Sequence, residues 1–199
     1  GAATGASSGA SSSSSATTGD AAAAAAMSCL AEQAKILVAE AEENNLDHKV
    51  LDERLERWYK CSLCEQRYHA VVRNALGWAC WKTYVGQPYG PVEEWYRGAA
   101  MNLLALGLSD ACHHMDALSV REAQLSELRR VGAPEHNMPV VQGNLAVTYH
   151  LLKRFEEALR LRRDVYSGHL KLCGEENRLT LIAANNYALS LLAMQQFEE

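Results

Sequence analysis

A segment near the C-terminal end of the chain, Gly143 to Glu157, returns 42 residues later, and this periodicity constrains the fold more than any other feature. The residues that recur in matching places are Asn144 and Asn186, Ala146 and Ala188, and Phe155 and Phe197. Self-similarity at a fixed period of this size is typical of arrays of supersecondary units, each of which cannot bury its apolar face without a neighbour. The repeat therefore favours a binding scaffold.

Almost every stretch after Met27 has apolar residues at helical spacing, and no run alternates at period two over the length of a strand. The chain is therefore predicted to be all-α. Residues 31–43 form one apolar face that should end at Asn44-Asn45, and Asp47 can cap the next helix. A further helix is expected over residues 66–84.

Helix pairs are predicted after the Gly- and Pro-rich breaker at residues 86–91, where we place a domain boundary. The expected pairs are 92–107 with 115–130 and 137–152 with 155–172, followed by a third unit that begins near Arg178. The first pair aligns with the second at an offset of 41, as in Leu104 with Leu145 and Ala117 with Ala158. Residues 27–86 would then form a helical cap on this array.

The first 26 residues are nearly all Gly, Ala, Ser and Thr, with Asp20 as the only charge, and are predicted to be a disordered tail. They lack the features of a secretory signal, but their Ser and Ala content leaves a plastid transit peptide open beside the cytoplasmic location that we expect. No apolar run approaches the roughly 20 residues that cross a bilayer, so no membrane span is expected. The net charge of -5 argues against a nucleic-acid partner, and six scattered cysteines favour a reducing compartment.

The repeat resembles the tetratricopeptide repeat, in the longer variety found in kinesin light chains. The resemblance is carried by Asn-Leu-Ala-x-x-Tyr at residues 144–149, by Phe-Glu-Glu-Ala at 155–158 and by the turn at 132–137. It covers residues 91–199, with repeats over about 92–133, 134–175 and, in part, 176–199. It implies an α-solenoid of helix hairpins whose first helices line a concave groove for a peptide or a partner subunit.

Asparagines on the first helices are the candidate partner-binding residues, because one amide offers a donor and an acceptor to a peptide backbone. These are Asn102, Asn144, Asn185 and Asn186. Equally open is that they hydrogen-bond between neighbouring repeats or cap local backbone. Val140, Val147 and Leu189 can make the groove apolar, and we keep Val147 and Leu189 among the candidates, although a core position is the favoured interpretation for all three.

Cys61-x-x-Cys64 is the one pair with the spacing of metal ligands, but a tetrahedral zinc site needs four. His69 follows at the distance found in a zinc knuckle, whereas Asn74 stands where the fourth ligand belongs. The simpler alternative, which we favour, is a pair of reduced, partly buried thiols without a cofactor.

The stretch Trp58 to Cys64 also resembles the end of a RING-CH finger, as in algal proteins that combine this finger with kinesin-light-chain-like repeats. The resemblance implies zinc binding by Cys29, Cys61 and Cys64, the last three of eight ligands. With five ligands missing, the finger should not form, because zinc binding is part of its folding free energy.

The paired carboxylates of the chain stand at expected helix starts, as in Glu156-Glu157, where they complement the helix dipole. No phosphate loop, nucleophile elbow or metalloprotease motif is present in the sequence, and no catalytic residue is predicted. The expected function is a non-enzymatic protein-protein interaction scaffold. A truncated RING-CH ubiquitin ligase with substrate-recognition repeats and a structural subunit of a larger complex are the alternatives.

Overall fold

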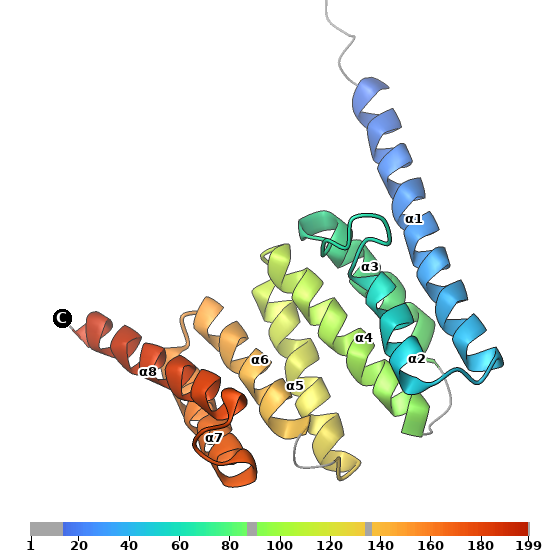
Figure 1. The fold of residues 1–199 in the computed structure, drawn as a ribbon. Coiled ribbons are helices and arrows are strands. Elements are labelled where there is room, and N and C mark those ends of the chain that lie inside the picture. The colour runs from blue at the N-terminus through green and yellow to red at the C-terminus, as the bar shows by residue number, and fades with distance from the viewer. Residues whose placement is uncertain (1–13, 87–90, 134–136, 199) are drawn as a thin grey trace, which may run out of the picture. The chain divides into compact units, whose positions relative to one another are not determined.

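The computed structural model describes residues 14–86, 91–133 and 137–198, and these residues are helical almost throughout (Figure 1). The elements are α1 (Ser14–Glu43), α2 (His48–Leu55), the 3-10 helix η1 (Glu56–Trp58), α3 (Ala70–Tyr84), α4 (Pro91–Asp110), α5 (His114–Arg130), α6 (Asn137–Leu151), α7 (Phe155–Cys173) and α8 (Arg178–Glu198). Apart from a single bridge between Lys60 and Arg67, no strand pairing occurs in the described ranges. The all-α prediction is confirmed.

The chain divides into two compact units, Gly1–Trp58 and Tyr59–Glu199. The boundary that we expected at residues 86–91, of which 87–90 lie outside the described residues, is not where the units separate. Helix α3 packs closely on α4, so it belongs to the same unit as the repeats and not to a separate cap. A Gly- and Pro-rich breaker marks a turn as readily as a linker, so the domain bounds expected from the sequence stay predictions.

The first unit is held by an apolar stripe on α1. Ala34, Val38 and Ala41 are buried at the spacing of one helix face, as are Leu51 and Leu55 of α2 and Trp58 of η1. The predicted cap is present: the Asp47 carboxylate accepts a hydrogen bond of 3.0 Å from the Val50 amide. Asn45 adopts a φ of 48°, so the predicted end of α1 at Asn44-Asn45 is also found.

Helix α1 begins at Ser14, which corrects the expectation that residues 1–26 are disordered; residues 1–13 of that tail lie outside the described residues. Six consecutive alanines at 21–26 extend the helix backwards, because alanine has the highest helix propensity and adding a residue to an existing helix costs little. The segment Ala21–Glu43 is thereby long and apolar enough to cross a membrane, whereas we expected from the sequence that no stretch of the chain would be. Core helices and leader sequences share these properties, so length and composition do not assign α1 to a membrane.

In the second unit, two glycines let α3 and α4 approach backbone to backbone. A Cβ atom at Gly107 would lie 2.6 Å from Cα of Asn74, and one at Gly77 would lie 2.9 Å from the carbonyl oxygen of Leu103. Real Cβ atoms do not come this close to backbone. The close approach fixes α4, whose first half carries residues of the candidate site below.

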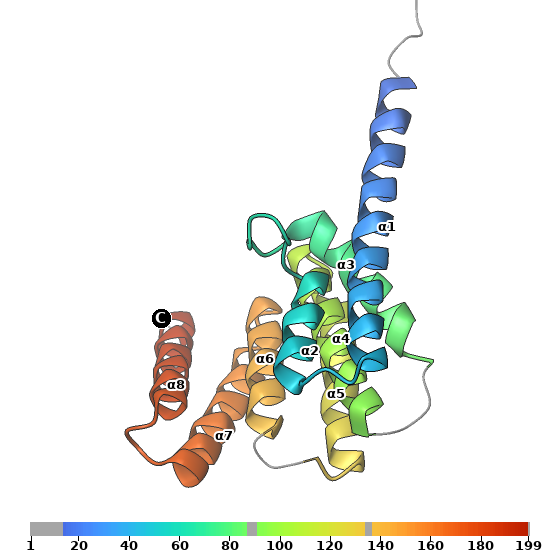
Figure 2. The same cartoon turned by 45° about the vertical axis from the view of Figure 1, so that its right-hand side comes forward.

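Helices α4 to α8 each pack on the next one along the chain (Figure 2). Leu104 and Leu108 of α4 cluster with Ala117 of α5, and a second cluster joins α5 to α6. Farther on, the rings of Tyr166 and Tyr187 stack between α7 and α8, with centroids 6.3 Å apart. The predicted helices of the repeat region are thus present, with ends displaced by a few residues.

We predict that Gly107→Ala lowers the free energy of unfolding by about 1–3 kcal/mol, because the added methyl group forces α3 and α4 apart. Urea unfolding followed by circular dichroism measures the loss. Gly143→Ala in α6 is the matched control, since nothing lies within 4 Å of its added Cβ and alanine favours a helix. Equal stability of the two variants would contradict the close packing of α3 on α4.

Candidate functional site

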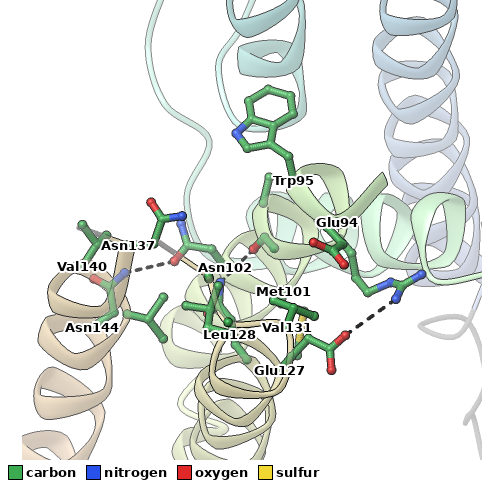
Figure 3. Close-up of a pocket in the computed structure, with 17 residues that line it drawn as sticks. Glu94, Trp95, Met101, Asn102, Glu127, Leu128, Val131, Asn137, Val140 and Asn144 are labelled. Carbon is green, nitrogen blue, oxygen red and sulfur yellow. Dashed lines mark hydrogen bonds and ion pairs between the residues drawn. The ribbon is translucent and has the colours of Figure 1, made fainter. Parts of the chain in front are cut away.

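A groove of about 610 Å³ lies between α4, the C-terminal half of α5 with the turn after it, and the first half of α6 (Figure 3). The residues that line it are Glu94, Trp95, Arg97, Gly98, Ala99, Met101, Asn102, Gln124, Glu127, Leu128, Val131, Gly132, Ala133, Asn137, Val140, Val141 and Asn144. Its size lies within the range of sites that take a side chain or a small ligand.

Two asparagines 42 residues apart meet in this groove. The Nδ2 group of Asn144 donates a 3.2 Å hydrogen bond to Oδ1 of Asn102, and Nη1 of Arg121 donates one of 3.4 Å to the same oxygen. Arg121 is almost fully buried in α5, and burial lowers its pKa to about 10. The guanidinium therefore stays charged at neutral pH and turns the oxygen of Asn102 towards itself.

This arrangement leaves one donor and one acceptor in the groove. Asn102 and Asn144 form no other side-chain hydrogen bonds among the described residues. Since Oδ1 of Asn102 and one N–H of Asn144 are engaged, Nδ2 of Asn102 and Oδ1 of Asn144 remain for a ligand. The structure shows the hydrogen bond between neighbouring helical hairpins that was one interpretation of these asparagines, and partner binding stays a prediction.

Apolar side chains form the walls of the groove. Trp95 is 43% exposed and Val140 is 60% exposed, while Met101 and Leu128 lie deeper (Figure 3). An exposed indole is a typical anchor surface in protein-protein interfaces.

Charged groups at the rim are paired with one another. Glu127 accepts from Arg130 at 2.7 Å and lies 4.0 Å from Arg97. Between rim and core, Gln124 donates through Nε2 to the Gly98 carbonyl at 2.9 Å, whereas its buried Oε1 has no hydrogen-bond partner. The groove is therefore mainly apolar with a few oriented polar atoms.

The other predicted partner-binding residues do not line this groove. Asn185 and Asn186 are exposed on α8, where Arg162 donates to the Asn186 main-chain carbonyl at 3.4 Å. Val147 is 50% exposed on α6 and Leu189 is 52% exposed on α8. The favoured core position for Val140, Val147 and Leu189 is wrong, because all three side chains are at least half exposed.

Sequence reasoning missed Arg121, Gln124 and Trp95. A signal for the first two was present, because they fall on the buried face of α5 between Leu118 and Leu125. Polar residues at positions that the apolar period assigns to a core must find hydrogen bonds there. Nothing in the sequence around Trp95 distinguished it from an aromatic residue of the core.

Cys61 and Cys64 share one tight turn. The Glu65 amide donates to the Cys61 carbonyl at 3.1 Å, the Cys61 amide donates to Gln66 at 2.9 Å, and Glu65 has a φ of 57°. Hydrogen bonds from the main-chain amides of Cys64 and Leu63 and from the Cys64 thiol lower the pKa of Cys61. A thiolate at this position is stabilised by its own turn.

The turn supplies only half of the ligands that a zinc site needs. No group of three or more metal-ligating side chains occurs within the described ranges. Cys29 is exposed on α1 in the other unit, and His69 contacts Arg73 through Nδ1 at 3.3 Å. Zinc binding by Cys29, Cys61 and Cys64 stays a prediction.

Comparison with family models, with curated proteins and with solved structures gave no match for this chain.

We predict that Cys61 is alkylated by iodoacetamide faster at pH 7 than the exposed Cys112 and Cys173, because more of it is thiolate. Peptide mass mapping over a pH series measures each rate. Cys64→Ala should move the Cys61 profile to higher pH by removing the thiol donor, while the buried Cys80 should stay unmodified throughout. Equal rates for Cys61 and the two exposed thiols would contradict the stabilising turn.

Proposed function

We propose that this protein is a non-enzymatic interaction scaffold, an α-solenoid of tetratricopeptide-type hairpins that binds an extended segment of a partner protein in the groove of α4, α5 and α6. The observation that carries the proposal is the Asn102–Asn144 pair with its remaining donor and acceptor. An extended main chain presents a carbonyl and an amide that match these two groups.

The walls of the groove support the same ligand. A large apolar side chain of the bound segment can pack against Trp95, Met101 and Leu128, while its main chain faces the amides. Because Arg121 already holds the Asn102 amide, little rotamer entropy is lost on binding. Recognition would combine one apolar anchor with a main-chain clamp.

The test starts from peptides selected on the folded chain from a displayed random library. Asn144→Ala is expected to weaken the selected peptides by about 10-fold, since a main-chain donor loses its acceptor and the Asn102 amide loses a neighbour. Trp95→Ala should weaken them at least as much. Fluorescence anisotropy of labelled peptides measures both affinities.

Asn186→Ala is the matched control, because this amide is exposed on α8 and does not line the groove. Binding by this variant should equal that of the unaltered chain. If the selected peptides bind the Asn144→Ala and Trp95→Ala variants as tightly as they bind the unaltered chain, the groove is not their binding site.

A ubiquitin ligase of the RING-CH type is the second candidate, favoured by one observation, the amide-lined turn that holds Cys61 and Cys64. Such a turn suits a thiolate ligand, but the two further ligands of that zinc would have to come from elsewhere. A complete finger of this type holds two zinc ions.

Metal analysis of the purified chain separates the two candidates. Bound zinc that is lost in Cys61→Ser and kept in Cys112→Ser would support the ligase. A folded chain that holds no zinc after growth in zinc-supplemented medium would favour the interaction scaffold over the ligase.

A further inference from the structure

Helix α8 exposes its large apolar side chains and buries small or polar ones. Thr180, Ala183 and Ser190 are buried towards α7, whereas Leu181 is 58% and Leu192 is 56% exposed. Leu179, Ile182, Leu189 and Leu191 are also more than 40% exposed. No charged residue stands between Arg178 and Glu198, so this face is unusually apolar for a surface helix.

The 42-residue repeat identifies part of this face as a helix-packing surface. The positions of α6 equivalent to Leu181, Asn185, Ala188 and Leu192 are Pro139, Gly143, Ala146 and His150. Two of these positions in α6 lie against α7: an added Cβ at Gly168 would meet Pro139 at 3.6 Å, and the His150 ring meets Phe155 edge-on at 5.2 Å. Ala146 has no exposed surface at all, whereas its equivalent Ala188 is exposed.

The four residues of α8 form a narrow seam. Leu181, Asn185, Ala188 and Leu192 are spaced by four, three and four residues, the spacing of the inward positions in a two-helix coiled coil. At 100° per residue they fall within about 60° of one another around the helix. We call these four residues the α8 seam.

The seam is complementary to itself when two copies run antiparallel. Leu181 and Leu192 are equally far from the midpoint between Asn186 and Tyr187, and so are Asn185 and Ala188. A two-fold axis at that midpoint places Leu181 of one copy beside Leu192 of the other, and the short Ala188 beside Asn185. The small central residue permits close approach of the helices, and an asparagine at an inward position fixes the register.

Charge favours the same arrangement. Antiparallel packing puts Arg178 of one α8 opposite Gln195 in the last turn of the other, where the helix dipole is negative. Because the rest of the helix carries no charge, nothing on α8 repels a second α8.

We propose that the α8 seam is a self-association site, at which α8 of one chain packs antiparallel on α8 of a second copy. The interface is isologous, since the same patch serves both chains. It is separate from the groove of α4, α5 and α6, so the groove can be occupied in either copy.

Sedimentation of the whole chain tests the proposal. The mass is expected to rise from 21.9 kDa towards twice that value as the concentration is raised through the micromolar range. The double variant Leu181→Gln with Leu192→Gln should weaken association by about 100-fold or more, because it removes four leucines from one symmetric interface. Glutamine is a good helix former, so circular dichroism should show α8 intact.

Leu179→Gln is the control, because Leu179 is equally exposed on α8 but lies outside the seam. Its dimer should match that of the unaltered chain. A chain that stays monomeric at every concentration would overturn the proposal. A dimer that survives the double variant would overturn it as well.

A disulfide experiment tests whether the two α8 helices pack antiparallel. A mixture of Asn185→Cys and Ala188→Cys chains should form a disulfide between position 185 of one and position 188 of the other, located by peptide mapping. A parallel pair would instead join position 188 to position 188 in the Ala188→Cys chain alone, which would contradict the antiparallel packing. Peptide binding by these variants should be unchanged, so failure of this interface is distinguishable from failure of the groove.

Discussion

The carboxamide oxygen of Asn102 accepts hydrogen bonds from Arg121 and Asn144, and through it three consecutive helices share one polar contact. A guanidinium buried among apolar residues is costly unless acceptors are in place, so this contact restricts how α4, α5 and α6 can be packed. It also restricts the site, because an amide whose oxygen is engaged can present only its nitrogen. Packing and recognition thus depend on the same few atoms.

The position of α4 depends in turn on the two glycines at its contact with α3. Since Gly77 and Gly107 allow the two backbones to meet, α4 is held along its second half, which carries Asn102, and its first half carries Trp95 to the groove. The stacked rings of Tyr84 and Tyr96, 4.9 Å apart, extend that contact to the other end of α4. A groove built on a helix fixed at both ends suits a rigid recognition surface.

Much of the helical framework could be predicted from the sequence, because it follows from local rules. The Asp47 cap, the end of α1 at Asn44-Asn45 and the helix pairs after residue 91 all rest on capping chemistry and apolar period. The start of α1 was missed because Ala-rich sequence offers little to bury, while its helix propensity is high. The two compact units do not separate at the breaker, because close packing at Gly77 and Gly107 joins α3 to α4 across it.

Only part of the candidate site could be predicted from the sequence. The 42-residue period put Asn144 and Asn186 at equivalent places, whereas Asn102 is displaced by one residue because the first helix pair aligns with the second at an offset of 41. Only the tertiary structure decided that the two amides meet, that Arg121 orients one of them, and that Val140 faces solvent, because those outcomes depend on the rotation of each helix against its neighbours. The sequence determined which residues recur; the packing of α4, α5 and α6 determined which of their polar atoms form no hydrogen bond within the described residues.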